Sequence, residues 1–233
     1  MKKHTVVSHA EWLEARTKLL VKEKEFTRLR DRLSQERRDL PWERVDKPYS
    51  FEGVAGTRSL SQLFEQRSQL VVYHAMFAPE AAAACPQCSS WMDNFQGPLA
   101  HLNHHDVTLV AVSRAPFAKI AAYGKRMGWK HPWYSSGGSS FNYDFCVSFT
   151  PEDVKAGRAV YNYKQQDPDD MDREGVSVFF KDEQGAIFHT YSAYARGIDM
   201  LNLTYHYLDI SPRGRDEAET GPNWVRRHDE YEG

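Results

Sequence analysis

The sequence predicts an α/β fold in which helices cover a central β-sheet, preceded by a long helical arm. Two apolar runs without alternation, at residues 70–77 and 107–112, suit central strands that are buried on both faces. Each run is followed by a stretch of helical pattern, which gives the strand, helix, strand, helix order typical of an α/β sheet. Residues 8–38 contain neither Gly nor Pro and carry a seven-residue apolar repeat, which predicts one long amphipathic helix.

The arm helix has a start signal, a stop signal and an apolar stripe. Ser8 followed three residues later by Glu11 forms a capping box, and Pro41 supplies the stop. One helix cannot bury its own stripe, so we expect the arm to dock on a globular body, in its own chain or across a homodimer. Lys22 at an intermediate position weakens a two-stranded seam, which argues against a free-standing coiled coil. The stripe consists of Trp12, Leu19, Phe26 and Leu33.

A connector at residues 41–56 suggests a domain boundary near residue 45. The chain then divides into an arm, 1–44, and a body, 45–233, that ends in a charged tail. In order, the body is predicted to contain a short strand at 49–51, a short helix at 59–64, the strand at 70–77, a helical stretch from about residue 85 to 101, the strand at 107–112, a helix at 117–127, a loop-rich stretch at 129–168, a hairpin of strands at 176–180 and 186–191, and a final helix at 197–208.

Composition and charge exclude several classes of protein. The formal net charge of -2 is too small to attract polyanions, so we do not expect nucleic acid as a partner. The longest apolar stretch, 70–78, is far shorter than the roughly 20 residues needed to cross a bilayer, so we expect no membrane span. The basic start of the chain is not followed by an apolar secretion core, which predicts a cytoplasmic protein. Three cysteines, an odd number, fit a reducing compartment, where a close pair is expected to do chemistry.

One such pair, Cys85-Pro86-Gln87-Cys88, directly follows a predicted buried strand and opens a helix. At that position the unpaired backbone N–H groups favour a thiolate and lower the pKa of the outer cysteine, which makes Cys85 the candidate nucleophile. Two intervening residues let Cys88 attack a mixed disulfide on Cys85, which makes Cys88 the candidate resolving thiol. The alternative is a pair of inert cysteines that lie three residues apart.

Metal binding is a second alternative for the same pair. Cys85, Cys88, His101 and His105 have the spacing C-x₂-C-x₁₂-H-x₃-H of a structural zinc finger. A finger needs one uninterrupted helix into its first histidine, whereas Gly97-Pro98 interrupts this one, and no basic reading surface follows. We therefore expect neither a metal nor another cofactor.

The order strand, Cys-x-x-Cys, helix, strand, helix, hairpin and terminal helix resembles the thioredoxin fold, a central mixed sheet flanked by helices. At the level of whole strings, the chain resembles a bacterial thioredoxin-like family catalogued as domain of unknown function 899. The resemblance covers nearly the whole chain and implies the fold, while it leaves the reaction open. The strings are HAEWL (9–13), LLVKEK (19–24), SQLVVYH (68–74), SRAP (113–116), RMGW (126–129), FNYDF (141–145), HTYSAYARG (189–197), PRGRDE (212–217) and RHDEY (227–231).

Two departures limit what the resemblance implies about activity. Thioredoxins carry a cis-proline before the hairpin strand that faces the cysteines, and residues 173–177 contain none, so substrate docking is expected to differ. Peroxiredoxins, a neighbouring branch, place a proline and a threonine ahead of the peroxidatic cysteine, whereas Glu80 and four alanines separate Pro79 from Cys85. Classical peroxidase chemistry is therefore not expected. Arg114 follows the strand at 107–112 and could stabilise a thiolate, or it could cap its own loop.

Two further features carry weaker hypotheses. Cys146 lies between apolar residues and is expected to be a core residue, not a third redox partner. Tyr191, Tyr194 and Arg196 cluster between the last strand and the last helix, where they could line a ligand pocket or only pack.

The sequence therefore predicts a thiol-disulfide oxidoreductase or thiol-dependent reductase that acts on a protein or small-molecule thiol or disulfide. Cys85 attacks and Cys88 resolves in this prediction. The alternative is a non-catalytic binding protein of the same fold, with inert or metal-holding cysteines.

Overall fold

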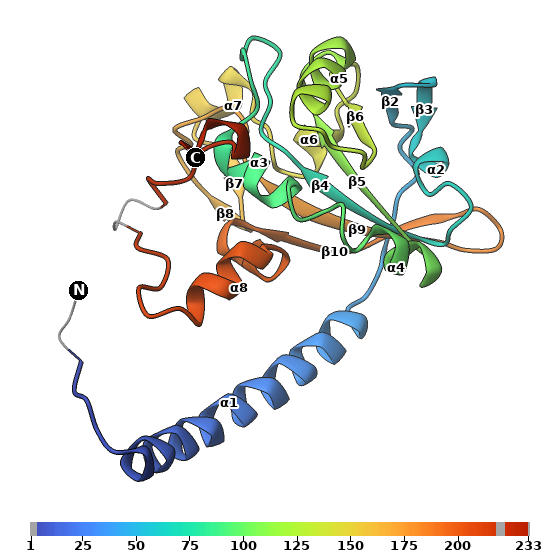
Figure 1. Ribbon diagram of the computed structural model, residues 1–233. Helices are drawn as coiled ribbons and strands as arrows, with labels where there is room; N and C mark the ends of the chain where they lie inside the picture. Colours follow the sequence, from blue (N-terminus) through green and yellow to red (C-terminus); the bar gives the residue numbers. More distant parts are fainter. Residues whose placement is uncertain (1–3, 218–221, 233) are drawn as a thin grey trace. The chain divides into compact units, whose positions relative to one another are not determined.

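The structure, a computed structural model, describes residues 4–217 and 222–232 (Figure 1). The chain divides into two compact units, Met1–Pro41 and Trp42–Gly233. The first unit contains one helix and the second contains the sheet. Within the described ranges, no helix is both long and apolar enough to cross a membrane.

The first unit contains the predicted long helix, α1 (His9–Arg38). Its capping box is present, because the Ser8 hydroxyl accepts a hydrogen bond from the backbone N–H of Glu11 at 3.3 Å. In return, the Glu11 carboxylate accepts one from the backbone N–H of Ser8 at 2.9 Å. The helix ends shortly before Pro41, which cannot continue it. The predicted helix is confirmed at both ends.

The second unit is built on a mixed β-sheet of eight strands. The strands are β1 (Glu43–Arg44), β2 (Ser50–Gly53), β3 (Gly56–Ser59), β4 (Gln69–His74), β5 (Val107–Ser113), β6 (Trp133–Ser135), β9 (Gly175–Lys181) and β10 (Ile187–Tyr194), and β7 (Val160–Tyr161) and β8 (Lys164–Gln165) form a separate pair. Their order across the large sheet is β1-β10-β9-β4-β5-β6-β2-β3. β5 is parallel to β4 and to β6, whereas β9 is antiparallel to β4 and to β10.

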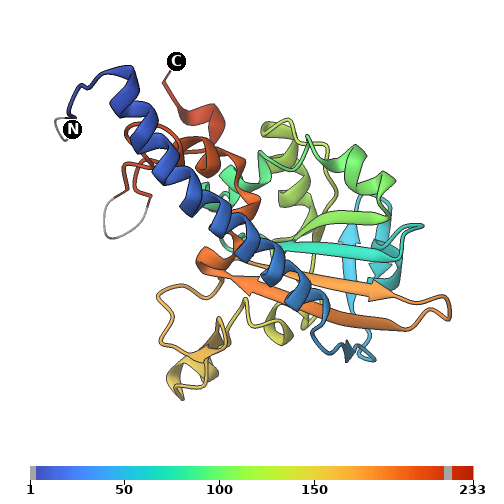
Figure 2. The ribbon, with the colours of Figure 1, turned by 90° about the horizontal axis from the view of Figure 1, so that it is seen from below.

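Helices cover both faces of this sheet, as the two views in Figures 1 and 2 show. They are α2 (Leu60–Leu63), α3 (Pro86–Met92), α4 (Leu99–His104), α5 (Phe117–Arg126), α6 (Phe141–Asp144), α7 (Pro151–Lys155) and α8 (Leu203–Asp209), with 3₁₀ helices η1 (Ala195–Leu201) and η2 (His228–Glu230). Successive side chains of a strand point to opposite faces, so Val72 and Tyr73 of β4 belong to different cores. Tyr73 lies in the core with residues of α3, α5 and α8, and Val72 lies in the core with residues of α2 and α6.

The central part of the sheet has the thioredoxin-like arrangement. β4, α3, β5 and α5 give two parallel neighbouring strands with a helical connection, and the β9–β10 hairpin lies antiparallel on the other side of β4. The predicted fold class, a thioredoxin-like central mixed sheet flanked by helices with a long N-terminal helix, is confirmed.

Three predicted elements differ in their limits. β4 stops at His74, although the apolar run continues, because the chain turns there into a loop that contains Pro79. The helical stretch predicted from the cysteine pair to about residue 101 is two helices, as its interruption at Gly97-Pro98 indicated: α3 ends at Met92, and α4 starts after Pro98, which cannot donate a helical hydrogen bond. The final helix is also two helices, η1 and α8, because the Asn202 side chain caps a new start.

Candidate redox site

The two predicted redox cysteines lie where the chain returns to the end of β4 and begins α3. The backbone N–H of Cys85 donates a hydrogen bond to the Met76 carbonyl at 3.0 Å, which closes the loop between β4 and α3. Cys85 is the N-cap residue of α3, and Pro86 occupies the first helical turn, where a missing N–H costs nothing. The Ser89 hydroxyl donates to the Cys85 carbonyl at 2.9 Å and fixes the start of the helix. These hydrogen bonds fix the backbone of the motif between the end of β4 and the start of α3.

The two thiols differ strongly in exposure. Cys85 is partly exposed, whereas Cys88 is 2% exposed and lies in the core between sheet and helices. The backbone N–H of Met76 donates to the Cys88 sulfur at 3.3 Å. A partner molecule can therefore approach Cys85 but not Cys88.

The same geometry separates the acidities of the two thiols. The Cys88 thiol donates toward the Cys85 sulfur and is the largest cause that lowers the pKa of Cys85, which is about 7. Burial opposes this shift, and the backbone N–H groups of Cys88 and Gln87 add to it. The interaction with Cys85, followed by burial, raises the pKa of Cys88 well above its ordinary value. At neutral pH the partly exposed sulfur is the one that carries the charge.

Tyr73 is a neighbour of the pair that the sequence analysis missed. Its side chain is fully buried, and its hydroxyl interacts with the buried Cys88 thiol. Burial raises the pKa of Tyr73 well above its ordinary value, and charge on Cys88 adds to the increase. The signal in the sequence was a hydroxyl-bearing residue within the apolar run of a predicted buried strand, shortly before the cysteines.

Glu174 is the second neighbour that the sequence analysis missed. Gly175, the first residue of β9, pairs with His74, the last residue of β4, so Glu174 precedes β9 at the edge where the chain leaves β4 toward Met76. The negative charge of Glu174 raises the pKa of Cys85 and of Cys88, although it is a minor cause for both.

A cavity of about 290 Å³ adjoins the motif. Gln87, between the two cysteines, forms part of its wall, and Arg196 of η1 forms another part. Of the residues between the last strand and the last helix that were expected to line a pocket or only to pack, Arg196 lines this cavity. Tyr194 instead packs in the interior, where its hydroxyl donates a hydrogen bond to the Phe145 carbonyl. The lining includes Gln87, Trp91, Glu174, Arg196, Asp199 and Arg215.

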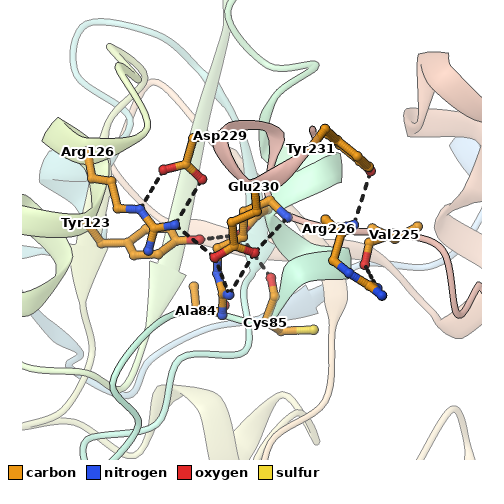
Figure 3. Close-up of polar contacts among 11 residues, drawn as sticks. Ala84, Cys85, Tyr123, Arg126, Val225, Arg226, Asp229, Glu230 and Tyr231 are labelled. Atoms are coloured by element: carbon orange, nitrogen blue, oxygen red, sulfur yellow. Dashed lines mark hydrogen bonds and ion pairs between the residues drawn. The ribbon is translucent and has the colours of Figure 1, made fainter. Parts of the chain in front are cut away.

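The C-terminal segment, residues 225–231, contacts the loop that carries Cys85 (Figure 3). The Arg227 guanidinium donates two hydrogen bonds, at 3.2 and 2.8 Å, to the carbonyl of Ala84, the residue before Cys85. Arg126 of α5 binds Asp229 and Glu230 of the same segment at 2.7 and 2.9 Å. The predicted charged tail therefore ends in a segment that is tied to α5 and to the cysteine loop.

Arg114, the third predicted site residue, is engaged elsewhere. Its Nε donates to the buried carboxylate of Asp172 at 2.7 Å, and its Nη1 donates to the Tyr143 hydroxyl at 3.0 Å. No contact between described residues joins it to either cysteine. A role for Arg114 beside the thiolate stays a prediction.

The remaining cysteine and the zinc spacing can also be placed. Cys146 is partly buried, has a positive φ of 55°, and its pKa is raised by burial.

The two histidines of the zinc-finger spacing lie on a different helix from the cysteines. His101 is on α4 and His105 is its C-cap residue, whereas the cysteines are at the start of α3. Among the residues that the structure describes, no group of three His, Cys, Asp or Glu side chains is placed to hold a metal ion. The zinc-finger spacing is thus not realised as a ligand cluster in these ranges.

Comparison with known proteins gives one family and several distant folds. The sequence profile of the family described as "Bacterial protein of unknown function (DUF899)" matches residues 1–231. No curated protein matches the chain. Among solved structures, the peroxidoxin BcpB from Mycobacterium tuberculosis is similar at 16% identity over 70% of this chain and 94% of its own, with a TM-score of 0.46. The bacterioferritin comigratory protein of Xanthomonas campestris is similar at 15% identity over 68% of this chain and 87% of its own, with a TM-score of 0.45.

Proposed function

The chain belongs to the bacterial family of unknown function DUF899, and from that starting point we propose that it is a thiol-disulfide oxidoreductase that uses Cys85 and Cys88. One observation carries the proposal: a partly exposed thiol with a pKa of about 7 faces a buried thiol of raised pKa. Inert structural cysteines do not need this asymmetry, whereas a two-step exchange depends on it.

The exchange proceeds in two steps. The Cys85 thiolate attacks one sulfur of a disulfide, the disulfide bond breaks, and the first thiolate leaves and takes up a proton from solvent. Cys88 then loses its proton and attacks the Cys85 sulfur, which expels the second thiolate and closes the Cys85–Cys88 bond. The protein loses two electrons and the substrate gains two. The reverse sequence, with an external dithiol, restores the reduced protein.

Burial of Cys88 sets the order of these steps. An external disulfide cannot reach a side chain that is 2% exposed, so the first bond forms at Cys85. The raised pKa of Cys88 keeps that thiol protonated until its neighbour has become part of a mixed disulfide and no longer carries a charge.

Redox titration with mass-spectrometric trapping tests the proposal. The full chain is equilibrated in buffers of oxidised and reduced glutathione, and of oxidised and reduced dithiothreitol for more reducing potentials, then quenched in acid, alkylated and digested. We expect Cys85 and Cys88 to lose their thiols together and to appear in one linked peptide, while Cys146 stays alkylated. Cys146→Ser is the matched control and should titrate like the parent chain.

Two results would contradict the proposal. If both thiols stay free at every ratio of the buffer, the pair is inert and the alternative of a binding protein gains support. If stoichiometric zinc copurifies and its removal unfolds the chain, the cysteines hold a metal.

A further inference from the structure

Glu174 places an uncompensated negative charge next to the redox pair. This inference rests on the proposed function: we propose that Glu174 makes the site selective for small disulfides that carry an ammonium group close to the sulfur. Such substrates are the disulfides of aminothiols. Disulfides that carry carboxylates near the sulfur are disfavoured by the same group.

The sheet register fixes Glu174 at this position. β9 pairs with β4 through the whole length of β4, from Gln69 with Phe180 to His74 with Gly175. Glu174 is therefore held at the end of the pairing, and its backbone carbonyl accepts a hydrogen bond from the Tyr161 hydroxyl at 2.9 Å. The chain leaving β4 reaches Met76, which contacts both cysteines, within two residues. The register therefore brings residue 174 to the end of β4 beside the cysteine loop, close enough for the charge of Glu174 to act on both thiols.

The cavity beside the motif has room for a small substituent. Its volume is about 290 Å³, and Gln87 and Glu174 both line it. This volume is just below the range of about 300–1,000 Å³ that is usual for small-molecule sites. It suits a short chain attached to sulfur better than a folded protein loop. Gln87 lies between the two cysteines and lines the cavity together with Glu174, so a substituent that extends from Cys85 into this cavity shares it with the carboxylate.

The positive charges in the cavity wall are already compensated. Arg215 binds Asp199 at 2.8 Å and Asp209 at 2.7 Å, and Arg196 approaches Asp199 at 3.3 Å. Glu174, in contrast, forms no ion pair with any residue that the structure describes. Glu217, a second carboxylate in the cavity wall, lies beside Tyr205 and likewise forms no ion pair within the described ranges. The unpaired charges that a substrate meets are therefore negative, with Glu174 the one whose charge acts on both cysteines, and the complementary substrate group is a cation.

The size of the effect follows from the strength of one partly screened charge. A single close charge pair at a partly exposed site changes a rate or an affinity by roughly tenfold in either direction. Salt screens such a pair, so the selectivity should shrink at high ionic strength.

The test uses three small disulfides of different charge. The reduced full chain, freed of reductant, is mixed at neutral pH and low salt with cystamine (cationic), bis(hydroxyethyl) disulfide (neutral) or dithiodipropionate (anionic). Oxidation is followed by acid quench, alkylation and mass spectrometry. The measured quantity is the ratio of the rate with cystamine to the rate with dithiodipropionate.

Variants separate charge recognition from thiol reactivity. We expect Glu174→Gln to lower the ratio by roughly tenfold. Loss of the carboxylate also changes the pKa of Cys85, but this acts on all three rates equally and leaves the ratio unaffected. Glu183→Gln is the control, because it removes the same charge at a distant place. Glu183 is exposed in the β9–β10 turn, at the opposite end of β9 from Glu174. Glu174→Lys should favour dithiodipropionate.

The outcomes distinguish this inference from the function on which it rests. If the chain is oxidised by the neutral disulfide and the ratio is the same in the parent, Glu174→Gln and Glu174→Lys proteins, charge selection by Glu174 is refuted and the proposed function stands. If none of the three disulfides oxidises the chain, the proposed function fails and the inference fails with it.

Discussion

Replacement of Cys88 by alanine tests what makes Cys85 acidic. The Cys88 thiol is the largest cause of the low pKa of Cys85, about 7 against an ordinary value of 9.0. At pH 7 a thiol with the lower value is about half ionised, whereas one with the ordinary value is about 1% ionised. Cys88→Ala should therefore move the midpoint of the alkylation profile of Cys85 upward, toward the ordinary value.

The rate at a single pH would be a poor measure of this change. Intrinsic nucleophilicity rises with pKa, by roughly eightfold over two units, and this offsets much of the lost ionisation. The variant should therefore react roughly sixfold more slowly at pH 7 and faster than the parent at high pH. The diagnostic result is two rate profiles that cross.

Iodoacetamide alkylation from about pH 5 to 10 in a Cys146→Ser background provides the assay, since the only other thiol is then Cys88. Cys88→Ser is the matched comparison, because its hydroxyl can still donate to the Cys85 sulfur, and its midpoint should stay closer to that of the parent. A midpoint near 7 in Cys88→Ala would show that the backbone N–H groups at the start of α3 suffice, and the reasoning from the Cys88 thiol would be refuted.

Four further predictions concern residues around the pair and the arm. Tyr73→Phe removes a buried hydroxyl that interacts with the weakly polar Cys88 thiol, so the free energy of unfolding in urea should change by no more than about 1 kcal/mol, and a larger loss would show that the hydroxyl is held by a stronger hydrogen bond. Arg227→Ala removes two hydrogen bonds to the carbonyl before Cys85 and should lower the free energy of unfolding by about 1–2 kcal/mol, with Arg227→Lys in between. Arg114→Ala leaves the buried carboxylate of Asp172 unpaired and should cost about 3 kcal/mol in the same assay; the alkylation midpoint of Cys85 should not move, and an upward shift would instead support a role beside the thiolate. Removal of residues 1–41 tests the expectation that the apolar stripe docks on a globular body: the truncated chain should then unfold at a lower temperature and aggregate, as measured by calorimetry and light scattering, because the docking surface loses its cover; an equally stable, soluble chain of proportionate mass would show that the arm covers nothing.

Most of the fold could be predicted because the signals were local. The capping box at Ser8, the unbroken apolar runs of β4 and β5, and the hairpin at its polar turn each depend on neighbours in sequence. The errors arose where one residue changes the outcome of a longer pattern. Asn202 divides the predicted last helix into two, whereas the break at Pro98 after the cysteines was visible in the sequence but its extent, from Asp93 to Pro98, was not. Helical pattern alone does not show on which side of such a residue the helix will resume.

The cysteine pair could also be found from the sequence, because the chemistry of a Cys-x-x-Cys motif is contained in four consecutive residues. Its acidity could be predicted in direction but not in cause. The expected cause was the start of the helix, whereas the largest contribution comes from the Cys88 thiol itself. The interaction between the two sulfurs depends on Met76, which holds both Cys85 and Cys88 by its backbone.

Glu174 shows where inference from sequence ends. It lies far along the chain from Cys85, and nothing in its neighbourhood of charged residues distinguishes it. Once the hairpin is assigned a place beside β4, the residue before β9 must approach the end of β4, so the position of Glu174 follows from topology. The lack of an ion pair at Glu174 does not follow from topology. It depends on Arg215 and Arg196 binding Asp199 and not Glu174. A fold prediction can thus identify which residues approach a reactive group, but substrate preference depends on which charges remain unpaired after folding.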